Sequence, residues 1–270
     1  MTSNEILDYY GAGQEEQRLT ASLGRLERIR TVEILERFLP AAPSRVLDVG
    51  GGTGVYALPL AAAGYLVDLV DPVAVHVARA QALSLEAPAH LRSATCGDAR
   101  HLEFADGTFD AVVMLGPMYH LVDADARLHA LTEARRVMTP GGVLIAAYIS
   151  RFASMCDGFT RGVLRDPSFA AIVDGDLTDG QHRNPTGRPD WFTTAYFHRP
   201  EEIAPELERA GFEPSCVLAV EGPGWFIADI DAWLDEPTAR TQLLEVLRRV
   251  EAEPAMLGAS AHLLAIGRKR

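Results

Sequence analysis

The stretch Val46-Leu47-Asp48-Val49-Gly50-Gly51-Gly52-Thr53-Gly54 decides the fold class of this chain. An apolar run of strand length leads directly into a glycine-rich turn, and residues 55–63 then have the character of a helix. Glycine is needed where a backbone turns tightly and lies close to a ligand, because it has no Cβ. The first N–H groups of the following helix point at the same ligand. The stretch therefore predicts a ligand-binding unit of strand, turn and helix.

Downstream, short apolar runs alternate with helical segments. We expect strands at 45–49, 66–70, 91–95, 111–115 and 143–149, and helices at 55–63, 73–85 and 125–138. Strands separated by helices pair in parallel through right-handed crossovers, which places helices on both faces of the sheet. The order predicts an open α/β sheet, preceded by a helix over 23–39 that Pro40 ends.

The alternation stops after the fifth expected strand. Residues 150–199 contain turn pairs such as Asp157-Gly158 and Asn184-Pro185, so we expect turns and short helices there. The aromatic content of this segment favours a packed insertion over disorder. Regular structure is expected again after this segment, with helices at 201–210 and 239–251 and strands at 217–220 and 262–266.

Composition narrows the classes of partner. The 270 residues include 25 Lys and Arg against 37 Asp and Glu, a formal charge of −12, which disfavours nucleic acids and anionic membranes. No apolar run is long enough to span a bilayer, and the first residues lack the features of a signal peptide. The three cysteines are scattered, and no His or Cys set has the spacing of a metal site. We therefore expect a cytoplasmic protein, a monomer or homodimer, without a metal.

The glycine turn by itself has two interpretations. Gly52-x-Gly54-x-x-Ala57 satisfies a dinucleotide fingerprint, with Asp71 at the end of the next strand as a ribose-binding acid. This interpretation implies a nicotinamide-dependent oxidoreductase. Alternatively, Asp48-x-Gly50-x-Gly52-x-Gly54 forms one unit that resembles the first motif of class I S-adenosylmethionine (SAM)-dependent methyltransferases.

Later segments favour the second interpretation, because each resembles a motif of that family in the right order. They are Asp71-Pro72, Gly97-Asp98-Ala99, Phe109-Asp110-Ala111-Val112-Val113 and Pro140-Gly141-Gly142. The resemblance implies that Asp71 binds the ribose hydroxyls of SAM and that Asp98 accepts a hydrogen bond from its adenine amine. Taken singly, the same acids are also typical of helix caps and turns.

The resemblance also implies an architecture. We expect a Rossmann-like, seven-stranded methyltransferase sheet with helices on both faces. An N-terminal helical lid (1–40) precedes the SAM-binding core (41–150), and an acceptor-site cap follows the fifth strand (151–199). Residues 200–270 complete the sheet and contain a second insertion near 222–258.

Candidate residues for the acceptor side lie outside the cofactor core. In the family, the loop after the fourth strand lies beside the transferred methyl group, so Leu115 and Gly116 are expected to touch the cofactor, and Tyr119 and His120 the acceptor. His198, in a loop rich in threonine and aromatic residues, is a second candidate base, because imidazole titrates near neutral pH.

Two residues of the lid are further candidates for binding SAM. Tyr10 can close over the sulfonium by an aromatic–cation contact, and Arg18 can pair with the methionine carboxylate. Both are equally typical of a solvated amphipathic helix. The function expected from the whole sequence is methyl transfer by in-line displacement to an O, N, S or C atom of a small-molecule acceptor. A non-catalytic SAM-binding protein remains the other alternative besides the oxidoreductase.

Overall fold

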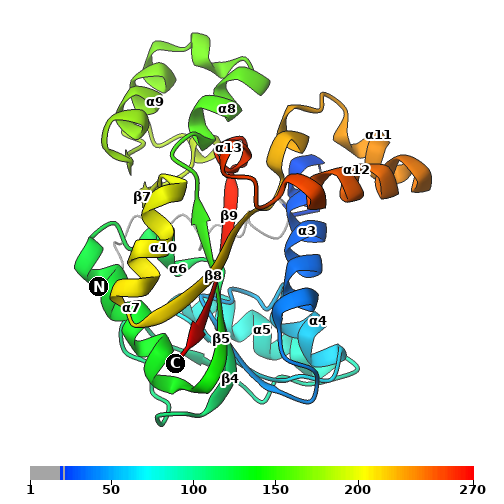
Figure 1. Cartoon of the computed structure of the whole chain (residues 1–270), viewed down its shortest axis with the longest axis vertical. Coiled ribbons are helices and arrows are strands. Elements are labelled where there is room, and N and C mark those ends of the chain that lie inside the picture. Colours follow the sequence, from blue (N-terminus) through cyan, green and yellow to red (C-terminus); the bar gives the residue numbers. More distant parts are fainter. Residues whose placement is uncertain (1–18, 21) are drawn as a thin grey trace.

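A single seven-stranded sheet forms the centre of the molecule (Figure 1). The computed structural model describes residues 19–20 and 22–270. The strand order is β3-β2-β1-β4-β5-β9-β8, with β1 to β5 parallel and β9 antiparallel to both of its neighbours. The strands are β1 Arg45–Val49, β2 Leu66–Asp71, β3 Ser93–Cys96, β4 Phe109–Met114, β5 Met138–Ile149, β8 Phe212–Ala219 and β9 His262–Lys269. The expected fold class is confirmed.

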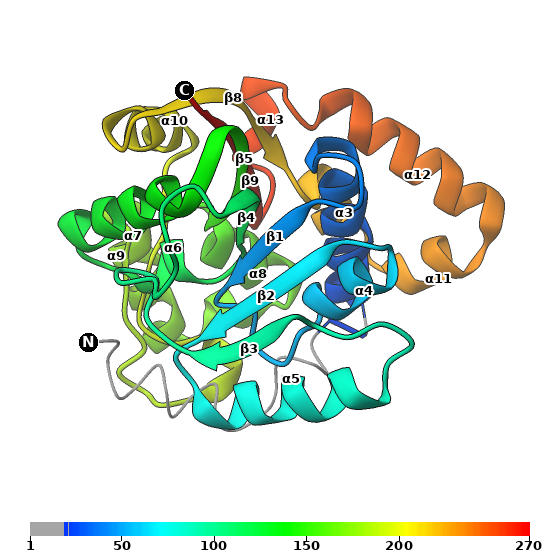
Figure 2. The same ribbon diagram turned by 90° about the horizontal axis from the view of Figure 1, so that it is seen from below.

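Helices cover both faces of the sheet because successive strand residues point to opposite sides. In β1, Val46 packs with the core beneath α3 (Ser22–Phe38), α4 (Ala57–Ala62) and α5 (Ala74–Glu86), whereas Leu47 packs with the opposite core. That second core lies beneath α7 (Ala124–Val137) and α10 (Pro200–Arg209). Figure 2 shows α3 and α4 on one side of the strands and α7 and α10 on the other. The two buried faces explain the nearly continuous apolar runs of the central strands.

Two strands begin five residues earlier than expected. Strand β5 starts at Met138 instead of residue 143, and β8 starts at Phe212 instead of residue 217. Strand β8 accommodates Pro214 because it lies at the edge of the sheet and pairs only with β9. A residue without a backbone N–H is tolerated there, so Pro214 does not delay the strand.

The cap, residues 151–199, is more regular than the expected turns and short helices. It contains α8 (Ala153–Thr160), the 13-residue α9 (Pro167–Asp179), a two-stranded ribbon of β6 (Gln181–His182) and β7 (Ala195–Tyr196), and 3-10 turns η1 (Val163–Arg165) and η2 (Pro189–Trp191). Its own small core joins Phe169, Ile172, Val173 and Trp191. In Figure 1, α8 and α9 lie beyond the end of β5 from which the cap leaves the sheet. Phe169, Trp191 and Phe197 are therefore buried, in line with the expected packing, whereas Phe159 is exposed.

A second helical segment separates β8 from β9. It comprises η3 (Gly222–Phe226), α11 (Ile230–Asp235), α12 (Pro237–Val250) and α13 (Pro254–Leu257). Its apolar residues pack on Leu26 of α3. The fully buried Arg30 of α3 donates to the carbonyl of Val220 and forms an ion pair with Glu251. These contacts attach the segment to the outer side of α3. Apart from residues 1–18 and 21, the chain contains no helix with the length and apolar character that crossing a bilayer requires.

Candidate functional site

The glycine turn lies where β1 and β4 end. The N–H of Gly50 donates to the carbonyl of Val70 at 2.7 Å, which ties the turn to β2. Gly50 has a φ of +74°, and a Cβ there would lie 2.8 Å from Cδ of Pro117. Only glycine therefore permits both the backbone conformation and the close approach of α6 (Pro117–His120).

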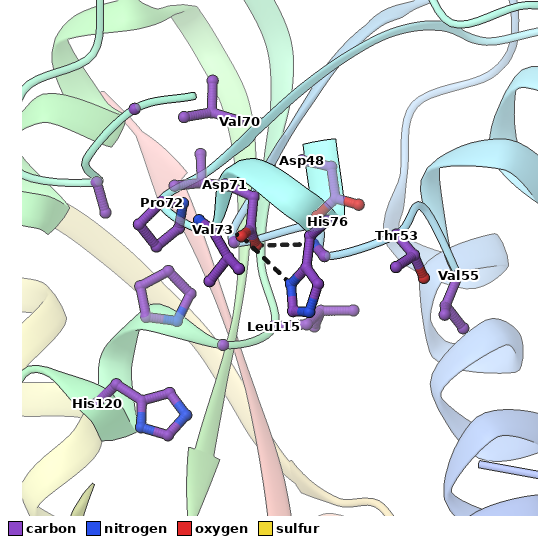
Figure 3. A pocket seen from close by; sticks show the side chains of 18 of the residues that line it. Asp48, Thr53, Val55, Val70, Asp71, Pro72, Val73, His76, Leu115 and His120 are labelled. Atoms are coloured by element: carbon purple, nitrogen blue, oxygen red, sulfur yellow. Dashed lines mark hydrogen bonds and ion pairs between the residues drawn. The ribbon is translucent and has the colours of Figure 1, made fainter. Parts of the chain in front are cut away.

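Asp71, the last residue of β2, organises this turn. Its Oδ2 accepts a hydrogen bond from the N–H of Gly52 at 2.9 Å, and its Oδ1 accepts one from Val73 at 2.9 Å. Nδ1 of His76, on α5, lies 3.5 Å from Oδ1. Figure 3 shows Asp71 and His76 facing each other, with Asp48 on the neighbouring strand. The carboxylate thus connects the ends of two strands with the first turn of α5.

Asp48 is a fully buried acid in the same region. Neither of its carboxylate oxygens has a hydrogen-bond partner among the described residues. Burial, with a smaller contribution from the charge of Asp71, raises the pKa of Asp48 to about 7. A Cβ on Gly51 would lie 2.7 Å from Oδ2 of Asp48. An unpartnered buried carboxyl that borders a pocket is suited to receive a cationic group of a ligand.

Asp98 follows β3 at the same edge of the sheet. Its Oδ1 accepts hydrogen bonds from the backbone N–H and Nε of Arg100, both at 2.9 Å. The side-chain hydrogen bond from Arg100 holds the pKa of Asp98 below its ordinary value. Gly97 precedes it, and a Cβ there would lie 2.8 Å from Cγ1 of Val70. Asp98 is therefore an ionised carboxylate, fixed close to the end of β2.

The wall opposite these acids begins after β4. Oη of Tyr119 donates to the carbonyl of Leu115 at 2.9 Å, which closes the short turn of α6. Nδ1 of His120 lies 3.4 Å from the carbonyl of Thr194 in the cap, and its ring centroid is 5.7 Å from that of Phe192. In Figure 3, His120 lies apart from the Asp48 and Asp71 group, on α6. The cap therefore rests directly on this wall.

These elements enclose one pocket of about 390 Å³, within the usual range of roughly 300–1,000 Å³ for small-molecule sites. The structure brings together in its lining nearly all described residues that the sequence nominated: Asp48, Gly50, Gly51, Gly52, Asp71, Pro72, Gly97, Asp98, Ala99, Leu115, Gly116, Tyr119 and His120. Tyr10 and Arg18 lie outside the described residues.

Sequence reasoning missed several residues of the lining. Leu19, Tyr56, His76, Arg79 and Pro117 also line the pocket. A signal for two of them was present, because His76 and Arg79 are three residues apart on the helix that follows Asp71 and therefore share one face of it. Leu19 gave no such signal, since it precedes the first periodic segment.

His198 does not belong to this lining, in contrast to its expected place beside the acceptor. The residue is 1% exposed, and its Nε2 lies 3.2 Å from Oε2 of Glu206 on α10. Its ring packs edge-on against Tyr148 and Tyr196, with centroid distances of 4.7 and 4.5 Å. Burial lowers the pKa of His198, although Glu206 opposes the shift. A buried imidazole with these contacts braces the cap against α10, and its position gives no support to a role as base.

Comparisons with known proteins agree with this geometry. Residues 46–142 match a family described as a methyltransferase domain. The chain is 34% identical over 192 residues to the malonyl-[acyl-carrier protein] O-methyltransferase of Geobacter sulfurreducens, an alignment that covers 69% of this chain and 61% of that protein. It is 30% identical over 184 residues to an uncharacterised methyltransferase of Mycobacterium bovis, covering 67% of this chain and 68% of the relative.

Among solved structures, a SAM-dependent methyltransferase of Thermotoga maritima, described as a possible histamine N-methyltransferase, has the same fold. Its TM-score is 0.60 at 19% identity, with 98% of this chain and 99% of that chain covered. The chain belongs to the family of SAM-dependent methyltransferases. The nicotinamide-dependent alternative finds no support in these relatives.

Proposed function

We propose that this protein transfers a methyl group from SAM to an O, N, S or C atom of a small-molecule acceptor. One observation carries the proposal. The pocket runs from the glycine turn and its acids to the apolar wall of Leu115, Pro117 and Tyr119, on which the cap rests. The acceptor would lie between the cap, the loop of Trp225, and Tyr119 with His120. A net charge of −12 and a partly apolar wall favour a small metabolite over a nucleic acid.

The residues of the pocket fit SAM. Asp48 offers an unpartnered buried carboxyl to the cationic methionine part, and the glycine turn leaves space that a Cβ would fill. Asp71 would hold the ribose, Asp98 with Gly97 and Ala99 the adenine, and Leu115 with Gly116 the region near the sulfur. When bound, SAM supplies an electrophilic methyl group. The residues of the chain align the acceptor behind that group and exclude water, and alignment of this kind contributes about 7–11 kcal/mol.

Replacement of Asp71 by alanine should weaken SAM binding by roughly 10- to 150-fold, because a hydrogen bond to a charged group contributes about 1.5–3 kcal/mol. The measurement is calorimetric titration with SAM. Asp174→Ala, at an exposed site on α9, is the matched control and should leave the affinity unchanged. Equal affinities of the Asp71→Ala variant and the wild type would remove Asp71 from the binding site.

The enzymatic activity requires its own test. We expect calorimetry to show binding of SAM and S-adenosylhomocysteine, and isotope-labelled SAM to methylate members of a panel of small hydroxyl, amine, thiol and carboxylate compounds. Binding of NAD without SAM would contradict the proposal. Tight binding of SAM without turnover of any small molecule would favour a non-catalytic binding protein instead.

We also propose that residues 1–40 form a lid over the bound donor. Leu19 supports this, because it is 5% exposed and lines the pocket together with the glycine turn. The proposed division continues with the core at 41–150, the cap at 151–199 and the sheet-completing segment at 200–270.

Deletion of residues 1–20 should raise the dissociation constant for SAM and abolish turnover, because Leu19 and the proposed contacts of Tyr10 and Arg18 are lost together. Calorimetry and circular dichroism would measure binding and folding. A deletion variant with wild-type affinity and activity would refute the lid. The remaining proposals are a cytoplasmic location and a monomeric or homodimeric state. Light scattering of the purified chain would determine the oligomeric state.

A further inference from the structure

The backbone of Phe192, in the cap, is strained. Its φ is +64° and its ψ is −176°, a combination that glycine adopts readily and a residue with a side chain does not. Among residues 19–20 and 22–270, Ser22 is the one other non-glycine residue with a positive φ. Strain of this kind persists only where the surrounding structure enforces it, and it is concentrated at functional sites. The conformation of Phe192 is therefore imposed by other residues of the cap.

Two polar side chains hold the peptide groups on either side of Phe192. Nε2 of His182 lies 3.0 Å from the carbonyl oxygen of Trp191, and Nδ2 of Asn184 donates to the carbonyl oxygen of Phe192 at 2.8 Å. The first contact fixes the plane of the peptide group before Phe192, and the second fixes the plane after it. Because the relative orientation of these two rigid planes defines φ and ψ, His182 and Asn184 together impose the strained conformation.

Both of these side chains are themselves anchored. Nδ1 of His182 lies 2.9 Å from Oδ2 of Asp176 on α9, and the same oxygen accepts a hydrogen bond from Oγ of Ser154 on α8 at 2.6 Å. Oδ1 of Asn184 accepts a hydrogen bond from Oγ1 of Thr186 at 2.6 Å. His182 and Asp176 are each 1% exposed. Hydrogen bonds buried in this way are strong, so the helices of the cap hold His182 in place.

The ring of Phe192 contacts two aromatic residues of α6 that line the pocket. Its centroid is 5.7 Å from that of His120 and 6.3 Å from that of Tyr119. The rings of Tyr119 and His120 are 4.6 Å apart in an edge-on arrangement. Tyr119 is fixed by its hydrogen bond to the carbonyl of Leu115. The ring of His120 therefore belongs to a cluster of three rings, of which Phe192 is the member that the cap supplies.

Filling of the core of the cap does not account for the strain. Phe192 is half-buried, and that core consists of other side chains, namely Phe169, Ile172, Val173 and Trp191. Phe192 packs instead in the apolar cluster that also contains Tyr119 and Trp225. A glycine at this position would relieve the strain, but it would remove the ring from the wall of the pocket.

We propose that Phe192 is a positioning residue for the acceptor side of the pocket, and that its ring, held by His182 and Asn184, sets the orientation of the ring of His120. Its effect on turnover rests on the methyl-transfer function proposed above. An acceptor that lies against a fixed His120 ring approaches the methyl group in one direction, whereas a mobile ring permits several. A misplacement of about 1 Å lowers a rate by as much as about 10²-fold.

The first test measures the strain by thermal unfolding. Phe192→Gly should unfold at a temperature about 2–5 °C above that of Phe192→Ala, because alanine retains the strain and glycine removes it. At the exposed Phe159 on helix α8 the order of the two variants should be reversed, since glycine weakens a helix relative to alanine. A Phe192→Gly variant that is less stable than Phe192→Ala would show that position 192 is unstrained, and would overturn the proposal.

The second test observes the ring of His120 directly. The protein carries isotope-labelled histidine and is saturated with S-adenosylhomocysteine, and the His120→Gln variant assigns the ring resonances in nuclear magnetic resonance spectra. These resonances should shift in Phe192→Leu and stay in place in Phe192→Tyr, which keeps the ring. Asn184→Ala should shift them as well, but should add nothing in a Phe192→Gly background, because the ring is already absent there. Unchanged His120 resonances in Phe192→Leu would contradict the assignment.

The third test separates positioning from folding. Catechol, benzylamine, thiophenol and benzoate serve as acceptors. For those that the wild type methylates, kcat/KM of Phe192→Leu should fall by about 10- to 100-fold. The dissociation constant for SAM should stay within about twofold, because Phe192 is not among the described residues that line the pocket. Phe192→Tyr should retain most of the wild-type rate.

Two results of the third test would count against the role of Phe192. They are equal losses of rate in the Leu and Tyr variants, and a parallel loss of SAM affinity, since both indicate a general disturbance of the cap. A wild type that binds SAM and passes the first two tests, yet methylates none of the four compounds, would contradict the methyl-transfer function and still support the positioning of His120 by Phe192.

Discussion

The SAM-free form of an Asp48→Asn variant is expected to be more stable than the wild type at pH 8, and yet to bind SAM far more weakly. Burial raises the pKa of Asp48 from 3.8 to about 7. In the unfolded chain this carboxyl ionises near its ordinary pKa, so folding is penalised increasingly between those two values and fully above pH 7. At about 1.4 kcal/mol per pKa unit the penalty reaches about 4 kcal/mol, and asparagine does not incur it.

The same substitution should weaken the binding of SAM, although it stabilises the SAM-free protein. A cationic group placed against Asp48 favours the ionised carboxylate, and removing one partner of a buried ion pair costs about 3–5 kcal/mol. The affinity for SAM should therefore fall by roughly 150- to 4,000-fold in the variant. In the wild type the affinity should decrease by up to about tenfold per pH unit below pH 7, because the carboxyl must first lose its proton.

Calorimetric titrations between pH 5.5 and 7.5, with thermal unfolding of the SAM-free proteins at pH 4 and pH 8, would check both effects. The stability gain should be present at pH 8 and nearly absent at pH 4. Asp71 and His76 are the other ionisable groups of this cluster. A variant that retains the wild-type pH dependence of binding would assign the titration to His76 and contradict a role for Asp48.

Replacement of Gly50 by alanine is the second change with a large expected effect. The backbone at this position has a φ of +74°, which an L-residue adopts with strain, and the new Cβ would lie 2.8 Å from Cδ of Pro117. The proline ring is rigid, so either the glycine turn or α6 must shift. Strain and overpacking together should lower the free energy of unfolding by about 2–4 kcal/mol. SAM affinity should fall as well, because the displaced turn no longer matches the ligand.

Gly175→Ala is the matched control, because it lies within α9 and a Cβ there would meet no atom within 4 Å. It should leave SAM binding unchanged and stabilise the protein by about 0.5–1 kcal/mol. Calorimetry and thermal unfolding of both variants would measure the difference. If the Gly50→Ala variant binds SAM with wild-type affinity, the turn accommodates the new Cβ without displacing the SAM-binding residues.

The donor half of the site could be predicted from the sequence because its information is local. Asp48, Asp71 and Asp98 each follow or end a short apolar run, and parallel strands bring their carboxyl ends to one edge. The structure places all three in the lining of one pocket. The order of the parallel strands is therefore sufficient to predict the approximate positions of these three acids.

The acceptor half was less predictable because its contacts join distant segments. His198 was expected in a loop beside the acceptor, but the packing of the cap against Glu206 of α10 buries it. Glu221 and His262 lie 41 positions apart and meet only because β8 and β9 are neighbours. Arg30 and Glu251 are 221 positions apart in the chain. Local periodicity in the sequence cannot predict contacts between residues so far apart.

The place of β9 in the sheet has a consequence for the order of assembly. This strand follows β8 in the chain but lies between β5 and β8, and it is the only described strand with which β8 pairs. Strands β1 to β5 pair among themselves, so the edge that binds the donor can form from nearby segments. The Glu221 and His262 pair has to wait for β9 to insert, and such long-range closure is slow. The strand ends that line the pocket therefore depend on contacts of shorter range than the Glu221 and His262 pair does.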